Sequence, residues 1–506
     1  MKNRIKNNQS RMSKAFPVFF ATLVLAVGLI LISAMTVSSL SFVYASESNL
    51  VGHSAYQCNS RTASAYPANA SSQFEDSPCH IFIMPGNILD INYTLDGGPD
   101  APSLFYNNML IIPMSQPMGL IASNQQMPAQ KPGALPVINN FPFMLPSYTP
   151  PSNWSTIWGR LAAYNATTGI KIWEDRLPAP VMSQPILVRN TIYISTGADF
   201  VNSAEYLNGI YAINATTGAF IWNVSTVSEH MPTPVFYNGS LIIVPGEGNP
   251  VMPDDQYLYA LNSSTGEPLW RLFVGGESAM SSPALVGNTI YFGVRMQPYG
   301  TIVSPQKTAL VAVSLATRKI LWEDFFNASL GTEDSSPSAS DNIVVSGYAT
   351  ISSNGTSEAT QTDNLYLVAA NATTGKILWK FNEGIGIRPP RSVLPATTIY
   401  NGLVYSDSAT VGTLYAVNLT TGKEAWSYRT FLSEPNPLPY KGYILDINQT
   451  GTLFVFNATT GKLVNLVNLY LAMGWCGTSE LQIVGNSLVV GGENNKLDIL
   501  PLSSIL

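Results

Sequence analysis

Two carboxylates, Asp334 and Glu434, stand at positions where other repeats of the chain place methionine. Asp334 precedes Pro337 by three residues. The residues at that distance before other prolines of the same series are Met182, Met231, Met280 and Glu434. A carboxyl group among thioethers would have a raised pKa, because burial disfavours its charged form. Such a group can donate a proton or accept one from water. Asp334 is therefore the predicted catalytic residue, and the competing interpretation is a solvated acidic residue in a loop.

Cations and aromatic groups are expected near this carboxylate. Glu333 adjoins it, and the segments predicted to share its end of the fold supply Arg295, Lys307, Arg388, Arg391, Trp475 and Cys476. Guanidinium and ammonium groups bind anions through charge-assisted hydrogen bonds. The predicted ligand of this set is therefore a small anionic substrate. His53, His80 and His230 show no metal-ligand spacing and no phosphate-binding glycine loop is present, so we expect no metal and no cofactor.

A repeated phrase shows which elements must position these residues. Seven times, an apolar pair leads into Asn-Ala-Thr-Thr-Gly or a relative of it, usually with Trp eight residues after the Asn. The copies begin at Asn165, Asn214, Asn262, Ser314, Asn371, Asn418 and Asn457, 39 to 57 residues apart. This period is typical of a four-stranded propeller blade. Each phrase predicts a hairpin turn in which Asn caps its own backbone and Gly takes a positive φ.

A second phrase predicts the inner two strands of each blade: a Pro, an Asn or Gly about five residues later, then a β-branched run. The two phrases give seven blades between Pro102 and Asn465, followed by a C-terminal remnant of about three strands, Leu481–Leu502. The apolar segment Ile81–Leu95 is the predicted fourth strand of that remnant, since joining the chain ends removes an exposed sheet edge. The predicted fold class is all-β, an eight-bladed β-propeller with its ring closed by an N-terminal strand.

The Trp-containing phrase resembles the tryptophan-docking repeat of the pyrroloquinoline quinone dehydrogenase-like propellers. The resemblance covers residues 80–502 and rests on six residues at one spacing, Trp173, Trp222, Trp270, Trp322, Trp379 and Trp426. It implies that each Trp packs between adjacent blades and is structural. Arg318 stands in place of Gly and Asn465 in place of Trp, so we expect blades four and seven to pack differently.

The N-terminus predicts export. Five basic residues precede an apolar run from Ala15 to about Met35, and Val43-Tyr44-Ala45 follows, as in a secretory signal. The run is also long enough to be an uncleaved membrane anchor. The predicted domains are residues 1–45 as signal peptide or anchor, 46–80 as an N-terminal segment, and 81–506 as the propeller. Residues 114–157 form the longest of the predicted top-face loops, where binding sites are usually built.

Composition indicates an acidic exterior. Charged residues make up 11% of the chain, about half the usual share. Asn does not titrate, so turns capped by Asn keep their hydrogen bonds below the Asp pKa of about 4. The alternative is that low charge only reflects a Thr/Ser/Asn-rich secreted β protein. Fourteen Asn-x-Ser/Thr triplets follow the leader, so the chain is a candidate glycoprotein.

Export also favours a disulfide between Cys58 and Cys79, which leaves Cys476 unpaired. The formal net charge of −6 argues against nucleic acid as a partner. A homo-oligomer is expected, and membrane contact would be limited to the N-terminus.

Three functions fit this sequence. The chain resembles the tetrathionate hydrolases of acidophiles in its export leader, composition, blade count and lone Asp, which implies hydrolysis of tetrathionate to thiosulfate, sulfur and sulfate with Asp334 as general acid/base. The fold resemblance implies a quinone-dependent alcohol or sugar dehydrogenase instead, although the vicinal Cys pair of many such enzymes is absent. The third interpretation is a non-catalytic scaffold of the cell envelope.

Overall fold

The structure of the chain is a computed structural model. It describes residues 103–115, 159–177, 183–197, 208–226, 228–247, 256–278, 281–296, 306–329, 331–353, 362–387, 397–407, 411–430, 436–448, 451–469, 481–492 and 496–506, the pairs 93–94 and 144–145, and residues 179, 181, 394 and 433. The chain divides into two units, Met1–Ala45 with Ile83–Pro85, and Ser46–Phe82 with Gly86–Leu506. The first unit lies outside the described residues, and every described strand belongs to the second.

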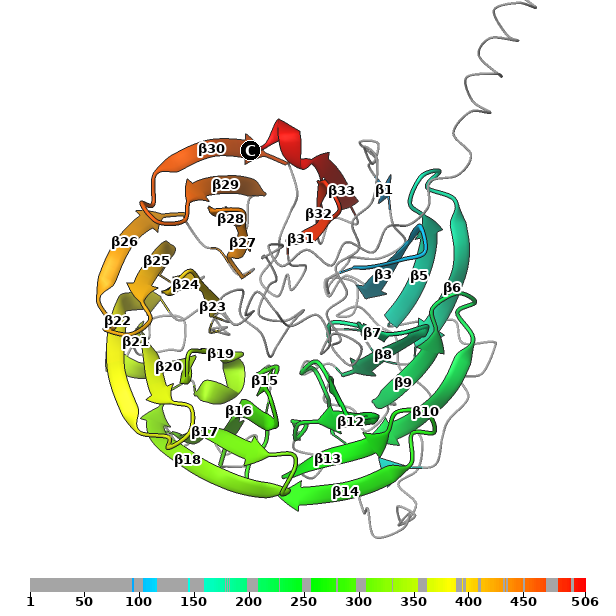
Figure 1. Cartoon of the computed structure of the whole chain (residues 1–506), viewed down its shortest axis with the longest axis horizontal. Helices are drawn as coiled ribbons and strands as arrows, with labels where there is room; N and C mark the ends of the chain where they lie inside the picture. Colours follow the sequence, from blue (N-terminus) through cyan, green and yellow to red (C-terminus); the bar gives the residue numbers. More distant parts are fainter. Residues whose placement is uncertain are drawn as a thin grey trace, which may run out of the picture. The chain divides into compact units, whose positions relative to one another are not determined.

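The described strands of the second unit form eight antiparallel sheets (Figure 1). In six of them the strands follow sequence order across the sheet, and in the other two an additional strand, β4 or β1, lies on the outer edge. Blade 1 holds β2 (Leu104–Tyr106), β3 (Met109–Ser115), β5 (Gly159–Asn165) and β6 (Lys171–Leu177). Blade 2 holds β7 (Ile186–Val188), β8 (Thr191–Thr196), β9 (Gly209–Asn214) and β10 (Phe220–Thr226). Blade 3 holds β11 (Val235–Tyr237), β12 (Ser240–Ile243), β13 (Tyr257–Asn262) and β14 (Pro268–Phe273). Blade 4 holds β15 (Ala284–Val286), β16 (Thr289–Arg295), β17 (Gln306–Ser314) and β18 (Lys319–Ala328).

The second half of the chain repeats the pattern. Blade 5 holds β19 (Ser338–Ser340), β20 (Ile343–Ser353), β21 (Thr362–Asn371) and β22 (Ile377–Ile387). Blade 6 holds β23 (Thr398–Tyr400), β24 (Leu403–Asp407), β25 (Thr413–Asn418) and β26 (Glu424–Arg429). Blade 7 holds β27 (Leu438–Tyr440), β28 (Tyr443–Ile447), β29 (Thr452–Asn457) and β30 (Leu463–Asn468). The predicted all-β, eight-bladed propeller is confirmed.

The eighth sheet combines the two ends of the described chain. It holds β31 (Gln482–Val484), β32 (Ser487–Gly492), β33 (Lys496–Pro501) and, on the outer edge, β1 (Tyr93–Thr94). Tyr93 lies opposite Leu497 and Thr94 opposite Lys496 in an antiparallel pair. Two 3₁₀ turns complete the described elements, η3 (Thr332–Asp334) and η5 (Leu502–Ser504). The rest of the predicted closing strand, residues 81–92 and 95, lies outside the described residues.

One short piece of the predicted 114–157 insertion is also described. The strand β4 (Met144–Leu145) pairs antiparallel with the last two residues of β10, Ser225 and Thr226. Blade 2 therefore has a fifth strand on its outer edge, which covers backbone groups that an edge strand would otherwise expose.

The repeated Asn-x-x-Thr-Gly phrase forms the predicted turn. The Oδ1 atom of Asn165 accepts the backbone N–H groups of Thr167 and Thr168, each at 2.9 Å. Gly169 has φ +70°, a region that costs Gly little and other residues more. The inner hairpins turn through pairs with positive φ such as Asn401 and Gly402, the pattern of a type I′ turn. Both phrases therefore encode hairpins.

Each of several Trp side chains joins its blade to the next one. The indole N–H of Trp379 in blade 5 donates to the Leu419 carbonyl of blade 6 at 2.8 Å. Equivalent hydrogen bonds to the following blade are made by Trp173, Trp222, Trp322 and Trp426. The glycine of the following turn lies against the same indole, so that an added Cβ at Gly422 would be 2.6 Å from Trp379 Cγ.

Arg318 and Asn465, the two residues that depart from the phrase, still contact a neighbouring blade. The Arg318 guanidinium of blade 4 lies 5.6 Å from the Trp270 ring of blade 3, a cation–π distance, although φ at Arg318 is +56°. Asn465 donates its side-chain N–H to the Ile505 carbonyl at 3.0 Å, as the Trp residues of other blades do. Blades 4 and 7 thus make chemically different contacts in the same place.

Two glycines in blade 6 have similar backbone conformations but different surroundings. Gly402 and Gly422 have nearly equal positive φ, +74° and +68°, but an added Cβ meets no atom within 4 Å at Gly402 and meets Trp379 at Gly422. We expect Gly402→Ala to cost about 1 kcal/mol in strain alone. Gly422→Ala should cost about 2 kcal/mol more, because overpacking adds to the strain. Thermal unfolding of the two variants checks this, and equal losses would contradict the docking role of the indole.

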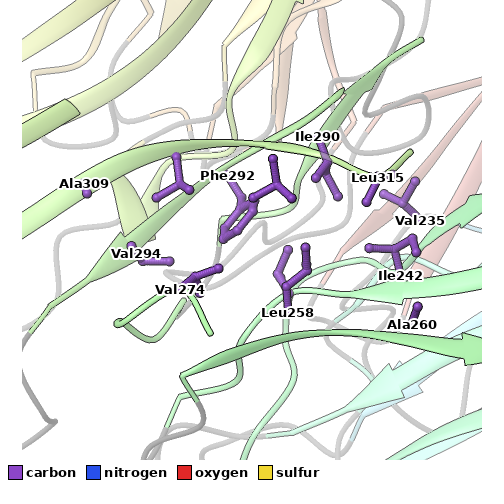
Figure 2. Close-up of a cluster of buried hydrophobic side chains, with 13 residues drawn as sticks. Val235, Ile242, Leu258, Ala260, Val274, Ile290, Phe292, Val294, Ala309 and Leu315 are labelled. Carbon is purple, nitrogen blue, oxygen red and sulfur yellow. The ribbon is translucent and has the colours of Figure 1, made fainter. Parts of the chain in front are cut away.

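The core lies between neighbouring sheets. Figure 2 shows the cluster between blades 3 and 4, where Ile242 and Leu258 face Ile290 and Phe292. Nearer the axis, polar groups of the inter-blade links join successive blades. The Gln184 N–H donates to Thr233 Oγ1, the Thr233 N–H to Ser282 Oγ, and the Ser282 N–H to Ser336 Oγ. Each of these residues directly precedes an inner-strand Pro of the repeat, so the Pro phrase also encodes the hydrogen bonds around the axis.

Candidate functional site

Asp334 lies in the link between blades 4 and 5. It ends the 3₁₀ turn η3, which packs against β16 and β17 of blade 4 and β20 of blade 5. Its backbone N–H donates to the Gly331 carbonyl at 3.2 Å, and the residue is half-buried. A half-buried carboxyl group can reach solvent and still be shielded in part. Of the other residues at the predicted axial positions, Met231 is buried, and Met182, Met280 and Glu434 lie outside the described residues.

Glu333, the neighbour of Asp334, is buried among protein groups. Only 1% of the residue is exposed. One carboxylate oxygen accepts the Thr308 hydroxyl at 2.6 Å, and the other accepts the Gly331 N–H at 3.3 Å. Its carbonyl accepts the Ser281 N–H at 2.7 Å. Glu333 therefore contacts the protein that surrounds the turn.

Arg295 lies at the end of β16 among carboxylates. Its Nε donates to Glu277 at 2.8 Å and its Nη2 to Glu247 at 2.7 Å, so it bridges blades 3 and 4. Burial lowers the pKa of Arg295, but the charges of the neighbouring carboxylates outweigh this and raise it overall. Those carboxylates are Glu247, Glu277 and Glu333. The guanidinium charge is thus already balanced by glutamates, and the side chain is 12% exposed.

The other predicted binding residues do not join this group within the described part of the chain. Lys307 is exposed, and its ammonium lies 4.1 Å from the centre of the Phe325 ring on the outer strand. Its neighbour Thr308 points to the opposite face of β17, since side chains alternate along a strand. The predicted contacts Arg388, Arg391, Trp475 and Cys476, and the predicted disulfide between Cys58 and Cys79, lie outside the described residues.

Three buried carboxyls in blades 5, 6 and 7 were not predicted from the sequence. Glu383, Asp407 and Asp446 are all buried. Burial raises the pKa of Glu383 to about 7 and that of Asp446 to about 6. Burial first, and then the charge of Asp446, raises the pKa of Asp407 well above its usual range. An acidic residue inside an apolar strand, as in Tyr443–Ile447, was the available signal.

Two of these carboxyls accept hydrogen bonds from buried hydroxyl groups. The Thr430 hydroxyl donates to Asp407 at 2.5 Å, and the Ser433 hydroxyl donates to Asp446 at 3.1 Å. The charge of Asp446 also raises the pKa of Asp407, because two carboxylates close together resist carrying both charges. Asp407 and Asp446 therefore titrate as a pair that holds a proton at acidic pH.

Two more carboxyls occupy inter-blade positions where other blades carry apolar residues. Asp175 and Asp324 each follow a docking Trp by two residues, where Val224, Leu272 and Phe381 stand in other blades. Burial raises the pKa of Asp175 to about 7 and also raises that of Asp324. A protonated carboxyl suits such an interface, because its neutral form is cheaper to bury.

Across the described ranges, no group of three or more His, Cys, Asp or Glu side chains is placed to hold a metal ion. The same ranges contain no helix with the length and apolar character of a membrane span.

Comparison with known proteins places the repeats in a family. Tetrathionate hydrolase of Acidithiobacillus ferrooxidans is 29% identical over 369 residues, 68% of this chain and 69% of the relative. Tetrathionate hydrolase of Acidianus ambivalens is 24% identical over 387 residues, 69% of this chain and 68% of the relative. BamB from Moraxella catarrhalis shares the fold, with a TM-score of 0.52 and 14% identity over 81% of this chain and 99% of that one.

The family model PQQ_2, described as outer membrane protein assembly factor BamB, matches residues 195–356 and 306–494. The two matches together extend over more than half of the chain and include the link that carries Asp334. The eight described sheets and the docking hydrogen bonds of five Trp residues agree with this match. The chain belongs to the PQQ_2 family of repeat propellers.

Proposed function

We propose that this protein hydrolyses tetrathionate in an acidic extracellular environment. The observation that carries the proposal is the 29% identity to a tetrathionate hydrolase over 369 residues. It is supported by the position of Asp334, a half-buried carboxyl on a turn fixed between two blades. Loops and turns held by a rigid scaffold are common places for catalytic groups.

The proposed reaction needs a group that handles protons. One tetrathionate and one water give one thiosulfate, one sulfur atom, one sulfate and two protons, which balances atoms and charge. Asp334 would accept a proton as water attacks the polythionate, or donate one to the leaving sulfur species. The sulfonate ends carry negative charge that cations can neutralise.

Neutralisation of the substrate is assigned to Arg388 and Arg391 in this proposal. Arg295 pairs with Glu277 and Glu247, and Lys307 lies over Phe325, so neither supports the role expected of it. Arg388 and Arg391 belong to the link that follows blade 5, next along the chain after the blade whose leading link carries Asp334. Trp475 and Cys476 remain proposed neighbours of the substrate, because their segment is predicted to share the end of the fold that carries Asp334.

Acidic conditions are supported by the buried carboxyls. The raised pKa values of Glu383, Asp407 and Asp446 favour a protonated state, which is the state that acid supplies. The N-terminal leader supports export.

A two-part assay of the secreted protein tests the function. We expect thiosulfate and sulfate from tetrathionate at a pH below the ordinary carboxyl pKa of about 4, without added quinone or calcium. Reduction of a dye by an alcohol or sugar, only when quinone and calcium are added, would instead support a dehydrogenase. The fold shared with BamB and the family description favour a scaffold as the second candidate, and inactivity in both assays would support it.

A further inference from the structure

The turn that carries Asp334 has little stability of its own. It spans Thr332–Asp334 and is closed by two long hydrogen bonds, from Asp334 N–H to the Gly331 carbonyl and from Ser335 N–H to the Thr332 carbonyl, each at 3.2 Å. Such 3₁₀ turns have poor hydrogen-bond geometry and persist in short pieces. The direction of the Asp334 side chain therefore depends on what holds the turn from outside.

A buried threonine of blade 4 supplies one such contact. Thr308 is fully buried in β17, opposite Arg295 of β16. Its Oγ1 accepts the Thr332 N–H at 3.0 Å and lies 2.9 Å from Thr332 Oγ1. The Thr332 hydroxyl in turn donates to the Ala309 carbonyl at 2.8 Å. The first residue of the turn is thus held by two adjacent residues of one strand.

The Glu333 carboxylate supplies the second contact. Its two oxygens accept from Thr308 and from Gly331, so the carboxylate links the strand to the start of its own turn. The turn also lies directly against blade 4, because a Cβ at Gly293 would overlap the Thr332 carbonyl and one at Gly331 would overlap the Thr308 side chain. A turn held at its carbonyl, amide and side-chain groups has one orientation in which all of these are satisfied.

We propose that Thr308 and Glu333 are positioning residues for Asp334, which hold its turn against blade 4 so that the Asp334 carboxyl meets the substrate in one orientation. This inference rests on the proposed function. It gives Glu333 a role within the protein in place of the substrate contact predicted from the sequence. Neither residue needs to touch the substrate, since misplacement of a reacting group by about 1 Å can cost about 100-fold in rate.

Thr308→Val tests the inference, because valine keeps the shape of threonine and removes the hydroxyl. We expect kcat for tetrathionate to fall about 10- to 100-fold, with KM changed less than about threefold because substrate contacts remain. Thr308→Ser restores the hydroxyl and should restore kcat to within about threefold of the wild type. Glu333→Gln keeps one acceptor oxygen of two and should lower kcat about 10-fold.

A buried threonine of blade 2 is the matched control. Thr196 accepts the Gly209 N–H at 3.0 Å within its own blade, so Thr196→Val should lower the melting temperature and leave kcat unchanged. Wild-type protein that does not hydrolyse tetrathionate overturns the proposed function and this inference together. Active wild type with equal kcat in Thr308→Val overturns the inference alone, as does equal loss of kcat in Thr196→Val. If Thr308→Val does not fold, Glu333→Gln decides between the same outcomes.

Discussion

Asp334→Asn is expected to lower kcat for tetrathionate by about 10² to 10⁴-fold, the range of one lost general acid or base. The amide has nearly the same shape as the carboxyl and cannot exchange a proton in this pH range. KM should change little, because the proposed substrate cations are untouched. The measurement is thiosulfate release under acidic conditions, with folding checked by thermal unfolding of both proteins.

Asp341→Asn is the matched control for that variant. It makes the same chemical change in the turn between β19 and β20 of blade 5, at an exposed residue with φ +49°, a conformation that Asn tolerates well. Its kcat should equal that of the wild type. Full activity in Asp334→Asn would show that another group handles the proton, and Asp334 would then be only a half-buried acidic link residue.

The second large effect is on stability, which should decrease as the pH rises from about 4 to about 8. The folded-state pKa values of Glu383, Asp407 and Asp446 lie above those of an unfolded chain. The stability that such groups contribute is complete below the unfolded pKa of about 4 and is lost as the pH passes the folded value. Glu383 moves from 4.5 to about 7, which corresponds to about 3 kcal/mol.

His230 has the opposite effect on the pH dependence of stability. Burial lowers its pKa to about 4, so its share of the stability is present above pH 6.5 and is lost as the pH falls through the folded value. Among the residues that the structure describes, this histidine opposes five carboxyls with raised pKa, including Asp175 and Asp324. The net expectation is therefore a loss of free energy of unfolding of at least about 3 kcal/mol between about pH 4 and pH 8.

Denaturant unfolding at several pH values measures this loss. Combining Glu383→Gln with Asp407→Asn should flatten the pH dependence, because neither amide titrates. Glu267→Gln, in an exposed turn of blade 3, is the control and should leave the dependence unchanged. Stability that is constant or that rises between about pH 5 and pH 8 would contradict the role given to the buried carboxyls.

The sequence alone determined the architecture. Asn-x-x-Thr-Gly and the Pro phrase specify hairpin turns through side-chain caps and positive φ angles, and these depend on residues a few positions apart. Their regular spacing then gave the blade count, and the location of Asp334 in a link followed from it. The sequence showed that Arg318 and Asn465 depart from the repeated phrase. It did not show what they contact, because their partners lie in neighbouring blades.

Only the tertiary structure decided which side chains meet. Arg295 bonds to Glu277, 18 residues away, and to Glu247, 48 residues away, and no local pattern specifies such pairs. The same holds for Asp407 and Asp446, which lie in different blades, and for Thr308 with Glu333. A local phrase fixes a turn through short-range hydrogen bonds. Burial and the pairing of charges depend instead on how the sheets pack, and this packing set the partners and the pKa values of the residues at the candidate site.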